Sequence, residues 1–181
     1  MPARMGCARL QDCVPNLRQW TLFACTLLLS ALTQAGDLPD PHLTPGATNP
    51  DVTQENIDRT VCVKGYTKTI RPPANYTNSL KKKQILQYGY ADTNLHDYEE
   101  DHLIALSIGG APWDAHNLWP QPRHSEWSAD KKDQLEFVMY KMVCARQISL
   151  VAAQHAMATD WISAWKIYVS KRHATRFAKM D

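Results

Sequence analysis

The chain has 181 residues, a hydrophobic content of 44% and a formal net charge of +2. This balance excludes a bulk polycation, so affinity for nucleic acid would have to come from the distribution of charge rather than from its total.

The first 35 residues have the features of a signal peptide. Arg4, Arg9 and Arg18 precede an apolar run at 20–32, and a small-x-small cleavage site ends at Ala35. The apolar run is shorter than the about 20 residues that a membrane span needs. We therefore expect a periplasmic or secreted mature chain, near zero net charge and without stable membrane association. An uncleaved anchor is the alternative.

Removal of the predicted signal peptide would also change the number of cysteines. Three of the five precede residue 36, and Cys62 and Cys144 remain. An even pair in an oxidising compartment predicts one disulfide. It would close a loop of about 80 residues and contribute about 4 kcal/mol in the chain-entropy model. Two buried free thiols are the alternative.

The segments before residue 90 are short. Residues 36–55 contain four prolines and few large apolar side chains, which predicts a proline-rich linker. Residues 60–63 and 66–70 resemble two short strands around Lys64-Gly65.

Three helices are predicted from apolar side chains at helical spacing. The first covers residues 79–88. The second follows the N-cap Ser128, carries an acidic residue in its first turn and ends near residue 144. The third follows Ser149 and runs to about residue 171, leaving 172–181 as a basic tail. The side chains expected to face inward are Leu80, Ile85, Leu86, Leu135, Val138, Met139, Met142, Leu150, Ala153, Met157, Trp161, Ile162, Trp165 and Tyr168.

The stretch 98–121 organises the chain. An acidic cluster runs into His102, and alternating apolar residues from Leu103 to Ile108 predict a strand. Gly109-Gly110 predicts a turn, and a second short strand is expected at 117–119. The order is carboxylate, imidazole, strand, glycine turn, asparagine, strand and helix.

These residue types suit hydrolysis of a phosphodiester. Histidine has the unperturbed pKa that a base near neutral pH requires. A divalent ion supplies positive charge at the leaving oxygen. Adjacent strand residues point to opposite faces, so Asp101 and His102 reach one site only where the backbone is irregular. The Asn117 amide is expected to bond loop backbone groups and hold the strand ends in register.

Glu-Asp-His-Leu-Ile, Gly-Gly, Asn-Leu-Trp-Pro-Gln and Lys-Asp-Gln-Leu-Glu together resemble the HNH endonuclease family of ββα-metal nucleases, over residues 56–171. The resemblance implies an α+β fold with a hairpin-plus-helix core. It implies that His102 is the general base, that Asn117 positions the loop, and that Asp101 ligates one divalent metal ion. Mg²⁺ is favoured, with Mn²⁺ or Zn²⁺ as alternatives. Asp130 and His124 are the candidates for the second ligand.

The predicted function is an exported, metal-dependent endonuclease with low sequence specificity, for which DNA is favoured over RNA. Lys131 and Lys132 are candidate phosphate contacts, with a solvated face as the alternative. Three tryptophans are expected in core or lid positions rather than as base-stacking platforms: Trp113, Trp119 and Trp127. The alternative function is a secreted nucleic-acid-binding module that keeps the scaffold without turnover.

Overall fold

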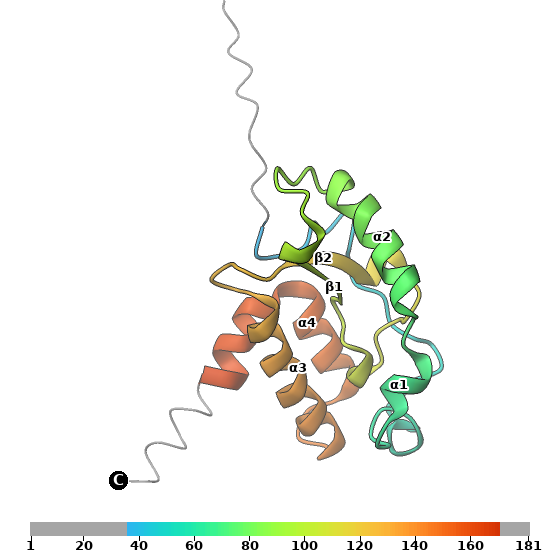
Figure 1. Cartoon of the computed structure of the whole chain (residues 1–181). Helices are drawn as coiled ribbons and strands as arrows, with labels where there is room; N and C mark the ends of the chain where they lie inside the picture. The colour runs from blue at the N-terminus through green and yellow to red at the C-terminus, as the bar shows by residue number, and fades with distance from the viewer. Residues whose placement is uncertain (1–35, 171–181) are drawn as a thin grey trace, which may run out of the picture. The chain divides into compact units, whose positions relative to one another are not determined.

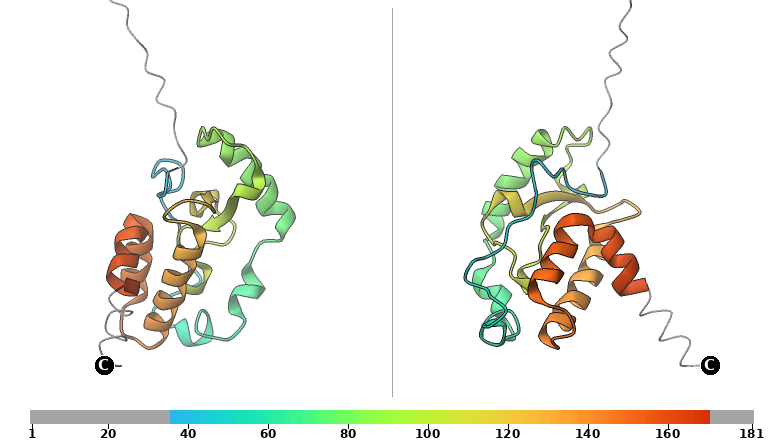
Figure 2. Two further views of the ribbon diagram at one scale, coloured as in Figure 1. Left: turned by 60° about the vertical axis from the view of Figure 1, so that its left-hand side comes forward. Right: turned by 180° about the vertical axis from the view of Figure 1, so that it is seen from behind.

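The computed structural model describes residues 36–170, so the predicted signal peptide and basic tail lie outside the described range. A two-stranded antiparallel sheet lies between helices (Figures 1 and 2). Helix α2 (Ala74–Gln87) covers one face of the sheet, and α3 (Ala129–Cys144) and α4 (Leu150–Trp165) lie on the other. This mixed architecture confirms the α+β class. Shorter helical segments are α1 (Tyr66–Ile70), the 3-10 turns Ile57–Arg59, Leu95–Asp97, Leu106–Ile108 and Ala115–Asn117, and the π-helical turn Lys166–Ser170.

The sheet is a hairpin of β1 (Tyr98–His102) and β2 (Leu118–Pro122), with His102 opposite Leu118 and Asp101 opposite Trp119. Opposed residues share a face, and successive residues alternate between faces. His102 therefore lies on the face toward α2. Asp101 and Trp119 lie on the face toward α3, where Trp119 joins the main apolar core.

The prediction of a strand over 103–108 is wrong, because β1 ends at His102. The backbone N–H of Leu103 still donates to Asn117 O at 2.8 Å. The next residue, Ile104, is bonded instead by the Asn117 side chain, whose Oδ1 accepts from Ile104 N at 2.9 Å. The apolar residues that suggested a strand are buried in this loop, so their pattern reflects burial rather than pairing.

Gly110 fits only as glycine in this loop. A Cβ built there would lie 1.7 Å from Ile104 O and 2.8 Å from Asn117 Nδ2. We expect Gly110→Ala to lower the free energy of unfolding by about 2–4 kcal/mol, because backbone has to move to relieve the contact. Urea denaturation measures this. Gly65→Ala is the control, because a Cβ there meets nothing within 4 Å and its cost is limited to the strain of a φ of +89°, about 1–2 kcal/mol. A Gly110→Ala cost no larger than that of Gly65→Ala would contradict the expectation.

The strands predicted before residue 71 are also absent. Residues 60–63 form turns, and residues 66–70 form α1. Gly65 precedes α1 with φ of +89°, a conformation that favours glycine. The Thr69 hydroxyl then donates to Tyr66 O at 2.7 Å, which supports a helical turn despite the β-branched composition.

The predicted disulfide is confirmed. Cys62 and Cys144 are joined, with their Cα atoms 5.6 Å apart. Cys144 is the last residue of α3, so the bond ties that end of the helix to the turns before α1.

The proline-rich segment is not a free linker. Its backbone runs along the site loop, where Gly46 N donates to His116 O at 2.9 Å and Ala111 N donates to Ala47 O at 2.9 Å. Thr44 and Val52 are buried. Prolines suit this role because they hold the chain extended without demanding further hydrogen bonds.

The predicted helices are present with some differences in extent and facing. Helix α2 begins earlier than expected, and Leu86 points outward with 72% of its surface exposed, whereas Ile85 is buried. Ser128 and Ser149 occupy the predicted N-cap positions of α3 and α4. The Ser149 hydroxyl accepts from Ala152 N at 3.2 Å.

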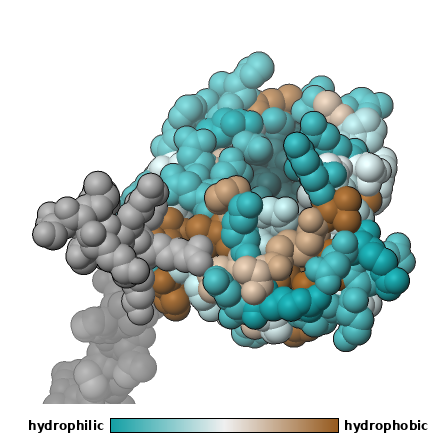
Figure 3. Space-filling view, turned by 90° about the horizontal axis from the view of Figure 1, so that it is seen from below, coloured by the Kyte–Doolittle hydropathy of each residue, from teal (hydrophilic) through white to brown (hydrophobic). Residues whose placement is uncertain are grey.

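None of the helices within residues 36–170 has both the length and the apolar character needed to cross a bilayer. The face of the molecule in Figure 3 is mostly hydrophilic, with hydrophobic residues in separate patches and a hollow among hydrophilic side chains.

Candidate active site

His102 ends β1 and is nearly enclosed, with 4% of its surface exposed. Its Nε2 lies 3.0 Å from Pro112 O, in the loop that leads to β2. A carbonyl oxygen only accepts, so Nε2 carries the proton of the neutral ring and donates it to this bond. The lone pair is then on Nδ1, which is the nitrogen available to take a proton.

The surroundings of His102 favour its neutral form. Burial lowers the pKa of His102, and the charges of Arg71 and Lys132 lower it further. The Pro112 carbonyl and the Asp101 carboxylate oppose this shift without reversing it. A ring that is neutral at pH 7 is what a general base requires.

Arg71 is a residue of the site that the sequence did not single out. Its guanidinium is close enough to His102 to lower the pKa of the ring. It is exposed and makes no ion pair or side-chain hydrogen bond within residues 36–170. An uncommitted guanidinium beside a histidine suits an incoming phosphate. The available signal is Arg71-Pro72-Pro73, in which a basic residue is held in extended backbone by the proline that follows it.

Asn117 holds the loop as its chemistry predicts. It is completely buried. Its Nδ2 donates to Ile104 O and to Ala111 O, each at 3.0 Å, and its Oδ1 accepts from Ile104 N. The backbone leaving β1 and the backbone approaching Pro112 are thus bonded to one side chain, and within residues 36–170 that side chain makes no hydrogen bond to the His102 ring.

Lys132 is fully buried and binds the strand that carries the site. Its Nζ donates to Asp101 Oδ2 at 2.6 Å, to His102 O at 2.7 Å and to the Glu136 carboxylate. Burial alone would lower the pKa of Lys132, but the two carboxylates outweigh it and raise this pKa. The interpretation of Lys132 as a phosphate contact is therefore wrong, because its ammonium is enclosed within the protein.

The predicted metal ligands are not gathered at one point. Asp101 is paired with Lys132, and His124 is exposed, with its Nε2 3.5 Å from Asp97 Oδ1. Asp130 is exposed in the first turn of α3. Across residues 36–170, no three His, Cys, Asp or Glu side chains are arranged to hold a metal ion.

The carboxylate of Asp133, which is not among the predicted metal ligands, interacts electrostatically with Asp101. Burial, followed by the charge of Asp101, raises the pKa of Asp133, and Asp130 adds to this effect. Carboxylates from β1 and the start of α3 therefore act on one another. An all-oxygen donor set of this kind suits a hard cation such as Mg²⁺.

Lys131 packs against Trp127, and Trp127 and Trp119 both contribute to the apolar core. The Lys131 Nζ lies 4.3 Å from the centroid of the Trp127 ring and is held against the protein. Trp127 is partly buried against the core, and Trp119 is fully buried. Both agree with the core or lid positions expected of them.

Glu100 lies on the same face of β1 as His102. Both of its carboxylate oxygens are buried and have no hydrogen-bond partner in the described part of the chain. Burial raises the pKa of Glu100 to about 8, with the Asp101 charge adding to the shift and Lys81 opposing it. Glu100 is therefore protonated at pH 7.

This shift predicts a dependence of stability on pH. The unfolded carboxyl releases its proton near 4.5, so its stabilising contribution is complete below that pH and is lost as the pH rises toward 8. We expect the protein in EDTA to lose on the order of a few kcal/mol across this window, at about 1.4 kcal/mol per unit of pKa difference. Glu100→Gln should lose much less. Urea denaturation at pH 5 and pH 9 compares them, and equal losses would refute the assignment.

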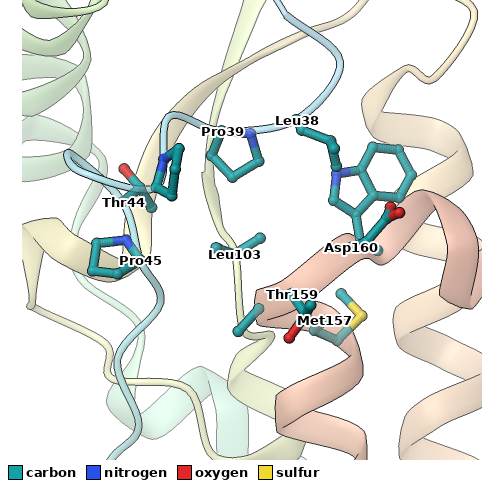
Figure 4. Close-up of a pocket in the computed structure, with 11 residues that line it drawn as sticks. Leu38, Pro39, Thr44, Pro45, Leu103, Met157, Thr159 and Asp160 are labelled. Atoms are coloured by element: carbon teal, nitrogen blue, oxygen red, sulfur yellow. The ribbon is translucent and has the colours of Figure 1, made fainter.

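A cavity of about 240 Å³ lies between residues 38–45 and α4 (Figure 4). Its walls include prolines, Leu103, Met157 and Trp161, and His102 is not among them. The carboxylate at its edge, Asp160, accepts from Ser163 N and from the Ser163 hydroxyl, where it caps the second part of α4. The cavity is therefore mostly apolar and is not the site of the chemistry described above.

Compared with known proteins, the chain matches no family model, no curated protein and no solved structure.

Proposed function

We propose that this protein is an exported, metal-dependent endonuclease that hydrolyses phosphodiester bonds in nucleic acid, with DNA as the favoured substrate. The observation that carries the proposal is the neutral His102 ring, held through Nε2 to the Pro112 carbonyl with Nδ1 left as the base. The uncommitted guanidinium of Arg71 acts on this ring and supplies positive charge for a phosphate, whereas the Asp101 carboxylate lies on the opposite face of β1. The HNH-like motifs occur in the same stretch of chain.

In this proposal, His102 Nδ1 takes a proton from a water molecule. The water oxygen forms a bond to phosphorus as the bond to the leaving 3′ oxygen breaks, and that oxygen then takes up a proton from solvent. Arg71 binds a non-bridging oxygen of the same phosphate. Asn117 acts indirectly, because it holds the loop that carries Pro112.

Asp101 and a carboxylate at the start of α3, Asp130 or Asp133, are proposed to hold one divalent ion, with Mg²⁺ favoured. Asp101 lies on the face of β1 opposite to His102, and His102 is the last residue of the strand. An ion bound at Asp101 would therefore act on a phosphate held at the end of the strand, where it would stabilise negative charge on the leaving oxygen. Lys132 already occupies Asp101 Oδ2, whereas no residue within 36–170 hydrogen-bonds to Oδ1. His124 fits this role less well, because it lies against Asp97.

Plasmid nicking tests the proposal. The disulfide-bonded protein is incubated with supercoiled DNA in Mg²⁺, Mn²⁺, Zn²⁺ or EDTA. Conversion to open circles in at least one metal and not in EDTA is expected. Absence of nicking in every metal, with a folded protein, would overturn the enzymatic proposal.

One observation favours the second candidate, a non-catalytic binding module. The Lys132 ammonium lies against Asp101 and thereby takes up part of the negative charge that a metal ion would require. A module of this kind would bind DNA equally well in EDTA and in Mg²⁺ and would cleave it in neither. Binding that requires the metal, or any metal-dependent nicking, would exclude this candidate.

A further inference from the structure

Trp113, for which a core or lid position is predicted, does not lie in the core. Its surface is 53% exposed, although it is the largest type of apolar side chain. It follows Pro112 directly, and the Pro112 carbonyl bonds the His102 ring. An exposed indole therefore lies one residue from the contact that orients the proposed base.

The Trp113 loop is held from several directions. The Tyr76 hydroxyl donates to Trp113 O at 2.7 Å, and the two rings form an edge-to-face pair with centroids 5.0 Å apart. Gln84 Nε2 donates to Ala115 O on one side of Trp113, and Asn117 Nδ2 donates to Ala111 O on the other. An aromatic ring fixed in this way loses little conformational entropy when a ligand stacks on it.

A positive charge, that of Arg71, lies just before the N-terminal end of α2, the end that carries Tyr76. Tyr76 is in the first turn of α2, and Arg71 lies five residues before it with an uncommitted guanidinium. The carboxylate next to Trp113, that of Asp114, accepts from His116 N and contacts His116 Nδ1. A phosphate contact and an aromatic surface, each next to His102 or its Pro112 contact, are the two elements of single-strand recognition.

We infer that Trp113, backed by Tyr76, stacks on an unpaired nucleobase of single-stranded DNA next to the phosphodiester that is cleaved. The inference rests on the proposed function and adds a substrate preference to it. Bases inside a duplex are stacked on one another and do not present their faces to the indole. The site therefore prefers single-stranded DNA to duplex DNA.

Binding of fluorescent oligonucleotides in EDTA tests the inference separately from cleavage. Trp113→Ala is expected to weaken binding of a single strand by about 5- to 150-fold, the range for loss of one stacked base, and to affect duplex binding much less. Trp113→Phe should retain most of the affinity. Phe137→Ala is the matched control, since Phe137 is 62% exposed and has Lys141 over its ring.

A set of single strands, each with one abasic position, adds a chemical double-mutant cycle. In the parent protein, one of these abasic positions should weaken binding. Trp113→Ala should bind that abasic oligonucleotide no more weakly than it binds the intact single strand, because the stacking contact is already lost. Equal single-strand affinity of parent and Trp113→Ala, or equal losses for single strand and duplex, would overturn the inference while metal-dependent nicking stands. A folded parent that neither binds nor nicks DNA overturns the proposed function and this inference together.

Discussion

His102→Ala is expected to lower the rate of DNA nicking by about 10²- to 10⁴-fold, the contribution of a positioned general base. The ring is bonded to the Pro112 carbonyl through Nε2 and keeps Nδ1 as a free basic nitrogen at neutral pH. The fold should survive, because the His102 side chain makes one hydrogen bond and the strand is held independently by Lys132 at the His102 carbonyl. Initial nicking rates, with circular dichroism to verify folding, measure the effect.

His116→Ala is the matched control. His116 is in the same loop but is exposed, and its ring contacts Asp114. This variant should nick at close to the parent rate.

Because burial lowers the pKa of His102, the acidic limb of the pH–rate profile of nicking should have its midpoint below about 6.5, the ordinary pKa of histidine. Parent-like nicking by His102→Ala would rule out the mechanism.

Lys132→Met is expected to lower the free energy of unfolding by about 3–5 kcal/mol, the usual cost of removing one partner from a buried ion pair. The change leaves Asp101, Glu136 and the His102 carbonyl facing a side chain that donates no hydrogen bond. Methionine keeps the length of the side chain, so lost packing contributes little. Urea denaturation of the disulfide-bonded protein at pH 7 gives the value.

Lys83→Met is the control, because Lys83 is exposed on α2 and its replacement should change stability by less than about 0.5 kcal/mol. A combined variant, Lys132→Met with Asp101→Asn and Glu136→Gln, should recover part of the loss by removing the unpaired charges. If Lys132→Met is as stable as the parent, the ammonium does not hold these three acceptors together.

Prediction from sequence succeeded where the signal is local. Helix spacing and an N-cap serine located α3 and α4, because both patterns are contained within a few turns of chain. The cysteine count located the disulfide once export was assumed. The strands were placed less well. The apolar residues around Leu103 are buried in a loop rather than in a strand. The side chains of β1 that face α2 include the polar Glu100 and His102, so β1 shows no alternation of apolar and polar residues.

The candidate site was only partly predictable, because only some of its contacts depend on residues that are close in the sequence. The bonds of Asn117 to loop backbone follow from its type and position, and the structure contains them. The pairing of Asp101 with Lys132 joins residues 31 apart, and no local pattern encodes it. Arg71 was missed because its proximity to His102 depends on how the chain passes from α1 into α2.

The sequence by itself determined the order of chemical groups, the even pair of cysteines after residue 35 and the two amphipathic helices, since each can be read from the order of residues along the chain. Only the tertiary structure decided that Lys132 is buried, that residues 44–49 line the loop, and that Trp113 is exposed beside the contact of His102. The physical reason is that burial, charge pairing and exposure depend on which distant segments meet. In this protein the hairpin contacts α2 on one face and α3 on the other, and these contacts determine which distant segments lie together.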